Sequence, residues 1–303
     1  MNRKTRHSGP DLFDEVLALV RERMSSGQVA QVETYVREFY RQVEPADLHD
    51  RQALDLYGAA LSHWRLARQR SSGESKLRIL NPRVDEHGWE CRHTVIELVN
   101  RDVPFLVDSI RMEVNAHGFA THLIIHPVIS LRRDEEGNLV EIHQAVGTRS
   151  DSFVSCMYLE ISRETDAGAL ASLERGLRGV LADVHASVED WVPMRQRMSD
   201  EVAAIKANPP QLPQDEVTEA REFLEWLTSN HFTFLGARDY DLMREGGDDV
   251  LRIVAGSGLG ILREKPGIEM STSFATLPAE MRERARKPEL LIITKSNSRS
   301  SVH

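Results

Sequence analysis

The stretch that decides the fold is Val99-Asn100-Arg101-Asp102-Val103-Pro104-Phe105-Leu106-Val107-Asp108-Ser109-Ile110, which runs on to His117-Gly118-Phe119. It follows a run rich in β-branched residues, Cys91 to Asn100, which is typical of a strand. From Val103 to His117 the apolar residues recur every four positions, which predicts an amphipathic helix with Pro104 in its first turn. Gly118 is the stop signal. The stretch therefore predicts a strand followed by a helix.

Further strands follow this unit along the chain. A second strand is predicted at Thr121 to Leu131, a polar turn at residues 134–138, a returning strand from Leu139 to Val146, and another strand from Phe153 to Ile161. A long helix comes next, with apolar residues three and four apart from Leu170 to Val188. Strand, helix, two strands and a helix form the split βαβ pattern of ferredoxin-like folds. We therefore expect an α+β fold with an antiparallel sheet (βαββα).

Periodicity and linkers suggest how the chain divides. Residues 1–73 read as a helical segment that ends at Ser71-Ser72-Gly73, and residues 74–207 as the sheet domain with its long C-terminal helices. Three prolines make residues 208–213 the expected linker. A second α+β domain, with a buried strand at Leu290–Thr294, is expected over 214–303. It has no closing helix, so we expect a truncated piece of a longer protein.

Composition excludes several classes of protein. The net charge is -9 and basic residues do not cluster, which argues against a nucleic-acid partner. No apolar run reaches the ~18–20 residues of a membrane span, and no signal peptide follows the start. The two cysteines, Cys91 and Cys156, form no CxxC and read as small core residues. We expect a soluble, cytoplasmic protein with no membrane partner.

Several segments together carry a resemblance to a known family. They are LVNRDVPFLVDSIRMEV (98–114), IIHPVI (124–129), FTFLGARDYDL (232–242), GSGLGILR (256–263) and ITKSNSRSSVH (293–303). The first resembles the ACT-domain signature, and the set, in this order and spacing, resembles the N-terminal part of the large bacterial NAD-specific glutamate dehydrogenases. The resemblance implies one or two ACT-like modules for regulation or assembly, with a homo-oligomer and the rest of the enzyme chain as partners. It implies that the parent enzyme converts L-glutamate to 2-oxoglutarate and ammonia with NAD.

The chemistry of that reaction is not expected in this chain. A dinucleotide site needs GxGxxG between a strand and a helix. The one candidate, Gly256 to Ile261, has glycine at its fifth place and no amphipathic helix after it, so a glycine-rich turn is favoured. A glycine-flanked lysine that could polarise glutamate is also missing. We therefore expect no catalytic residue, no bound cofactor and no metal in this portion, and NAD only in the parent enzyme.

An effector site is the one binding site that the resemblance implies. In ACT modules an amino acid binds at the loop between the first strand and helix, here Asn100, Arg101, Asp102, Val103 and Pro104, with Gly118 nearby. Helix N-terminal amides suit a carboxylate, and Asp102 suits an ammonium group. Phe105 stands where effector-binding members commonly have glycine, so it could block the approach of a ligand. The alternative is that Asp102 only caps the helix.

Other candidates favour plain structural roles. His122 and His126 are four apart on one predicted strand, ~13 Å, too far to share a metal ion with each other, and His143 lies on the returning strand. The charge run 282–287 suits a solvated face, and the polar residues 295–299 suit either a binding loop or a surface loop.

Two rival functions stay open. One is a stand-alone ACT-type amino-acid-binding regulator, and the other is a purely structural assembly module. The identity of any effector, the oligomer count and the number of ACT modules are left open as well.

Overall fold

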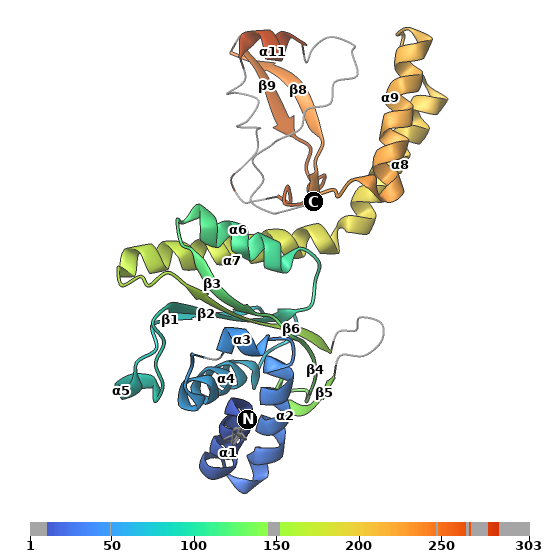
Figure 1. Cartoon of the computed structure of the whole chain (residues 1–303). Coiled ribbons are helices and arrows are strands. Elements are labelled where there is room, and N and C mark those ends of the chain that lie inside the picture. Colours follow the sequence, from blue (N-terminus) through green and yellow to red (C-terminus); the bar gives the residue numbers. More distant parts are fainter. Residues whose placement is uncertain are drawn as a thin grey trace, which may run out of the picture. The chain divides into compact units, whose positions relative to one another are not determined.

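The computed structural model describes residues 11–48, 50–144, 152–246, 248–264, 267 and 278–284. The chain divides into two compact units, 1–179 and 180–303, with the boundary inside one helix, α7 (Ala167–Glu189). Figure 1 shows the elements of both units, and each unit is described here by itself.

The first unit is built around an antiparallel sheet of six strands. Its two central strands are β2 (Thr94–Arg101) and β6 (Phe153–Ile161), which pair along their whole length. Two strands share the other side of β6, namely β3 (Thr121–Ile125) and β4 (Val128–Arg133). The ends of this path are β5 (Leu139–Gln144), next to β4, and β1 (Lys76–Leu80), next to β2. Among the described residues β3 pairs only with β6, so it also has an open side. The predicted α+β architecture with an antiparallel sheet is confirmed.

The predicted single strand Thr121–Leu131 is wrong, because the chain forms two strands there. The break falls at His126-Pro127, between β3 and β4. Proline has no N–H to donate to a strand ladder, and its ring restricts the residue before it. The Pro127 carbonyl still accepts a hydrogen bond from the Cys156 N–H (3.0 Å), so both halves stay on β6.

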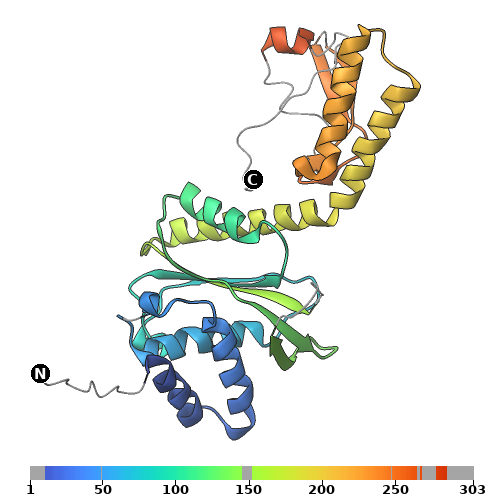
Figure 2. The ribbon, with the colours of Figure 1, turned by 45° about the vertical axis from the view of Figure 1, so that its right-hand side comes forward.

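Helices cover both faces of this sheet, as Figure 2 shows most plainly. One face carries α6 (Leu106–Ala116) and the first part of α7. The other carries α1 (Leu12–Arg23), α2 (Ser26–Tyr40), α3 (Pro45–Leu48) and α4 (Ala53–Ala67). A further one-turn helix, α5 (Val84–His87), connects β1 to β2. Because both faces are covered, every residue of β6 is buried.

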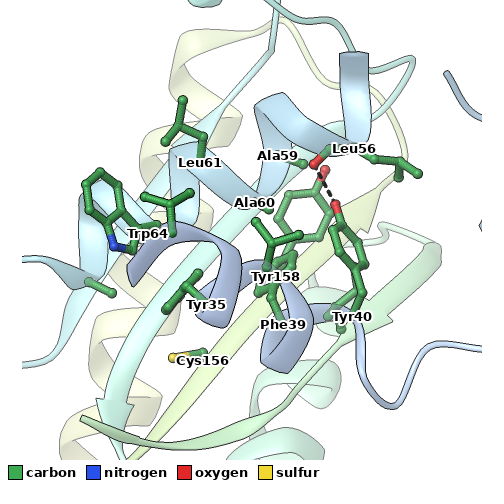
Figure 3. Close-up of a cluster of buried hydrophobic side chains, with 14 of the residues drawn as sticks. Tyr35, Phe39, Tyr40, Leu56, Ala59, Ala60, Leu61, Trp64, Cys156 and Tyr158 are labelled. Carbon is green, nitrogen blue, oxygen red and sulfur yellow. Dashed lines mark hydrogen bonds between the residues drawn. The ribbon is translucent and has the colours of Figure 1, made fainter. Parts of the chain in front are cut away.

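The N-terminal helices and the sheet share one hydrophobic core. Figure 3 shows Tyr35 and Phe39 of α2 and Trp64 of α4 beside Cys156 and Tyr158 of β6. The Phe39 ring lies edge-on to the Tyr158 ring, with centroids 6.0 Å apart. The helical segment predicted as residues 1–73 therefore lies in the same compact unit as the sheet. Amphipathic helices can bury their apolar stripes only against another apolar surface, and this face of the sheet provides one.

A buried histidine ties this core together. The Tyr35 hydroxyl and His63 Nδ1 are 2.8 Å apart, and His63 Nε2 lies 3.0 Å from the Met157 carbonyl oxygen. Burial lowers the pKa of His63, which favours the neutral ring that this environment requires. The histidine thus satisfies buried polar groups of helix and strand without introducing a charge.

The described residues of the second unit combine two long helices with two small β-ribbons. Its helices are α8 (Trp191–Ala207) and α9 (Gln214–Trp226), and α9 continues into the wider turn η1 (Leu227–His231). One ribbon pairs β7 (Gly236–Ala237) with β10 (Leu259–Gly260), and the other pairs β8 (Tyr240–Glu245) with β9 (Asp248–Ile253). A short helix, α11 (Ala279–Arg284), follows.

Two features of the second unit differ from the sequence-based expectation. Residues 208–213 connect α8 to α9, which contact one another, so this stretch lies within a compact unit and not between two. The aromatic-rich stretch Phe232–Tyr240 favours one strand by its residue types, but it forms only β7 and the first residue of β8. Among the described residues, no helix combines the length and the apolar character needed to span a bilayer.

Candidate functional site

The loop that the sequence marked as an effector site connects β2 to α6. Asn100 is 1% exposed, and its Oδ1 accepts a hydrogen bond from the Ser75 hydroxyl (2.7 Å). The Asp102 N–H donates to the Phe153 carbonyl (3.0 Å), which extends the β2–β6 pairing by one residue. Val103 is buried and Pro104 is exposed. Asn100, Arg101, Asp102, Val103 and Pro104 therefore lie together at the N-terminal end of α6.

Polar side chains lie near this end of the helix, of which Asn100, Ser109 and Ser155 are buried and His126 is partly buried. Asn100 faces Ser155 across the β2–β6 ladder, and the Ser155 hydroxyl lies 2.5 Å from His126 Nε2. Burial lowers the pKa of His126, and the nearby Asp102 carboxylate partly opposes this shift. Ser109, in the first turn of α6, is fully buried, and its hydroxyl has no hydrogen-bond partner among the described residues. We call Asn100, Ser109, His126 and Ser155 the polar cluster.

The structure separates Gly118 from the rest of the predicted site. Gly118 follows the C-terminal end of α6, and the eleven residues of the helix span about 16 Å. Its φ is +81°, and its N–H donates to the Asn115 carbonyl (2.9 Å). The glycine therefore ends the helix and does not approach the loop at its start.

The helix also begins later than predicted, at Leu106, and its N-cap residue is Phe105. The alternative in which Asp102 caps the helix is therefore wrong, because the turn at residues 104–105 intervenes. Phe105 has φ +67° and ψ 0°, a left-handed conformation that suits glycine and strains a residue with a Cβ. The backbone at this position favours glycine, but the residue is a phenylalanine, which is strained in this conformation.

Because of this strain, we expect glycine to stabilise the protein more than alanine at position 105, the reverse of their usual order within a helix. We expect Phe105→Gly to be more stable than Phe105→Ala by about 1 kcal/mol, because only alanine keeps a Cβ in the left-handed region. At Met112, an exposed position within α6, the order should reverse by a similar amount. Urea unfolding of the four variants measures both differences. Equal stabilities of the two variants at position 105 would contradict the left-handed backbone.

A second cluster brings together residues that no sequence pattern connects. The ligand atoms of Cys91, His93 and Glu160 all lie within 4.8 Å of one another. The Glu160 side chain is fully buried, and Arg51 donates to both of its carboxylate oxygens, one of them at 2.8 Å. His93 Nδ1 lies 2.9 Å from Oε2, and the Tyr158 hydroxyl donates to Oε1 (3.2 Å).

This cluster is better suited to an ion pair than to a metal. Burial raises the pKa of Cys91 to about 11, so its sulfur is a thiol at neutral pH, whereas metals bind the thiolate. Burial would also raise the pKa of Glu160, but Arg51 and His93 outweigh it and hold that pKa below its usual value. The guanidinium already occupies the carboxylate that a metal would need. Arg51 precedes α4 and Glu160 lies on β6, so the pair joins the helical layer to the sheet.

The other histidines and the glycine motif have local roles. His122 is exposed and its ring stacks on His93, with centroids 4.1 Å apart, while His143 Nε2 lies 3.2 Å from a carboxylate oxygen of Glu141. Gly260 has φ +60°, and a Cβ there would lie 2.1 Å from the Leu235 carbonyl oxygen. Gly260 therefore permits close backbone packing of β10 on β7.

Some predicted features fall outside the described residues. The strand at Leu290–Thr294 and the polar residues 295–299 lie there entirely, and the charge run 282–287 is described only as far as 284.

The antiparallel sheet and the order of its strands and helices define a class of protein: an ACT-like domain with an added helical layer. The family model described as glutamate dehydrogenase, ACT1 domain matches residues 35–177, from within α2 to within α7. The matched region includes most of the helical layer as well as the sheet.

Curated relatives extend the similarity over nearly the whole chain. The NAD-specific glutamate dehydrogenase of Halomonas elongata is 33% identical over 97% of this chain and 18% of the relative's length. The enzyme of Pseudomonas aeruginosa is 34% identical over 86% of this chain and 16% of its own length. The enzyme of Mycobacterium tuberculosis is 28% identical over 68% of this chain and 12% of its own length. The chain belongs to the family of large NAD-specific glutamate dehydrogenases and matches their N-terminal part. It spans less than a fifth of these relatives.

Proposed function

We propose that this chain is a non-catalytic regulatory portion of an NAD-dependent glutamate dehydrogenase. In the parent enzyme, NAD would accept a hydride as L-glutamate is converted to 2-oxoglutarate and ammonia. The ACT-like unit would bind an amino-acid effector and change the activity of the enzyme. Membership of the glutamate dehydrogenase family supports the parent reaction.

The observation that carries the effector proposal is the polar cluster at the N-terminal end of α6. The first N–H groups of a helix have no partner within the helix, and together with its dipole they favour a carboxylate. The Ser109 hydroxyl is buried in this first turn without a hydrogen-bond partner among the described residues. Asp102, partly exposed in the same loop, supplies a negative charge for the ammonium group. The carboxylate of an α-amino acid would thus meet hydrogen-bond donors at the start of α6, and its ammonium group would meet the Asp102 carboxylate.

Binding of an amino acid predicts a thermal stabilisation that depends on Asp102. A panel of the twenty amino acids, at concentrations up to about 100 times Kd, should include one that raises Tm, since such an excess adds about 2.7 kcal/mol. Asp102→Asn should abolish that rise, because the ammonium group loses its counter-charge. Asp14→Asn, which changes an exposed acid on α1 in the helical layer, should leave it unchanged. A rise that both variants retain would place the ligand elsewhere.

The arrangement of the sheet also supports assembly into a homo-oligomer. Both faces carry helices, so a second copy could pair with the sheet only along an edge strand. At β5, the carbonyls of Leu139 and Val140 already face the Gln31 amide at 3.4 and 3.3 Å. The ladder of β3 is interrupted by a register shift between Thr121 and Leu123, so the β1 edge is the better candidate. If no amino acid binds yet the chain sediments as an oligomer, the assembly function is favoured over the sensor.

A further inference from the structure

The α9 helix and the turn after it carry a row of exposed aromatic rings. Phe223 and Trp226 are 41% and 47% exposed. Their rings stack with centroids 6.0 Å apart and an angle of 16°, and the His231 ring stacks on Trp226 at 4.8 Å and 14°. Stacking keeps these rings in fixed positions, so they present a preformed apolar strip to solvent. An exposed apolar strip of this kind usually marks a contact surface.

Acidic residues share the same face of α9. Asp215, Glu219, Glu222 and Trp226 follow one another at spacings of four, three and four residues, so they line one side of the helix. The opposite side carries the buried Val217. Glu225 forms ion pairs with Lys206 (2.6 Å) and Arg221 (3.9 Å). In the part of the chain that the structure describes, Asp215, Glu219 and Glu222 form no ion pair. The face therefore combines apolar rings with uncompensated negative charge.

A matching surface must be apolar and positively charged. The sequence contains such a segment, Arg286-Lys287-Pro288-Glu289-Leu290-Leu291-Ile292-Ile293-Thr294-Lys295. Four large apolar residues stand in its centre, and the three basic residues on its two sides outnumber the single acid, Glu289. Its apolar centre is where the sequence predicts a buried strand, and such a strand needs a surface to bury against.

We propose that this acidic–aromatic face of α9 is the docking surface for residues 286–295 of the same chain. Leu290 to Ile293 would cover the Phe223 and Trp226 rings, and Lys287 and Lys295 would lie against Glu219 and Glu222. Burial of the rings provides the attraction, and the charges set the position of the segment. The second unit would then be completed by its own C-terminal segment.

A charge-swap experiment tests this docking. Hydrogen exchange of the α9 amides is measured in this chain, in Glu219→Lys/Glu222→Lys, in Lys287→Glu/Lys295→Glu, and in the variant with all four changes. Each double variant should speed exchange of α9 roughly three- to tenfold, because two opposite-charge contacts become repulsive. The fourfold variant should restore the slow exchange. Glu201→Lys, an exposed acid on α8, is the matched control and should change nothing.

Three results would overturn the proposal. The first is that hydrogen exchange of the α9 amides stays the same in Lys287→Glu/Lys295→Glu. Another is a change confined to the β8–β9 ribbon, which would place the segment on that ribbon instead. The third is protection of α9 that increases with protein concentration, which would assign the face to a second copy of the chain.

Discussion

Replacing Glu160 with glutamine lowers the free energy of unfolding of the first unit by about 2–3 kcal/mol at pH 7. The carboxylate is fully buried and accepts both hydrogen bonds of the Arg51 guanidinium, so glutamine leaves a half-buried positive charge without its partner. Removing one member of a buried pair costs about 3–5 kcal/mol. Arg51 retains 27% of its side-chain exposure, and water screening reduces that figure. Urea unfolding followed by circular dichroism measures the difference.

The pH dependence of this effect has a definite sign. The folded-state pKa of Glu160 lies below its usual value of 4.5, so the carboxylate stabilises the fold at pH values above that number. This contribution is lost as the pH falls through the folded pKa. The difference between the native chain and Glu160→Gln should therefore be full at pH 7 and shrink steadily below about pH 4.5. Measurements at pH 7, 5 and 3.5 follow it.

An exposed ion pair provides the control for this prediction. Glu141 accepts a hydrogen bond from Arg132 at 2.7 Å, but both side chains are about half exposed. Glu141→Gln should cost less than about 1 kcal/mol. If Glu160→Gln and Glu141→Gln lower the free energy of unfolding by the same amount, the buried pair contributes no more than an exposed one. The Glu160 pair would then not stabilise the contact between the helical layer and the sheet.

Replacing Phe39 with alanine should destabilise the helical layer and the sheet together, by about 3–5 kcal/mol. The Phe39 ring is fully buried where α2 meets the sheet, against Tyr40, His63 and Tyr158. Its removal leaves a cavity shared by both layers. Hydrogen exchange of β2 and β6 should therefore accelerate along with that of α2, because one core unfolds as one unit.

The comparison with Phe223→Ala makes this prediction specific. Phe223 lies in the second unit and is partly exposed, so its truncation should leave exchange in β2 and β6 unchanged. If Phe39→Ala accelerates exchange in α2 and leaves β2 and β6 protected, the N-terminal helices form a separate domain. That result would favour the division at residue 73 that the serine–glycine stretch suggests.

Local patterns predicted the strand–helix–strand order because its signals lie within short windows. Leu106, Ile110 and Val114 all appear on the buried side of α6, as their four-residue spacing indicated. The start of α6 was less predictable, since Pro104 suits a turn as well as a first helical position. A phenylalanine does not by itself indicate the left-handed backbone of residue 105, because such a backbone usually belongs to glycine. The one hint came from the family resemblance, in which glycine is common at this position.

In the candidate sites as well, residues close in sequence could be predicted to lie together, and residues far apart in sequence could not. The loop from Asn100 to Pro104 was expected from the family resemblance, which matches it as one continuous stretch of sequence. Arg51 and Glu160 are separated by 109 positions, and only the fold places them in contact. Ser155 and His126 joined Asn100 for the same reason, since strand register decides which side chains meet.

The order of residues alone determined the ACT-like strand–helix pattern and the family resemblance, because both depend on side-chain spacing along the chain. Tertiary structure alone decided that the N-terminal helices share the core of the sheet, that Glu160 is paired by Arg51, and that Gly118 lies far from the loop before α6. Burial and charge pairing depend on what surrounds a residue in space, and spacing along the chain does not contain that information.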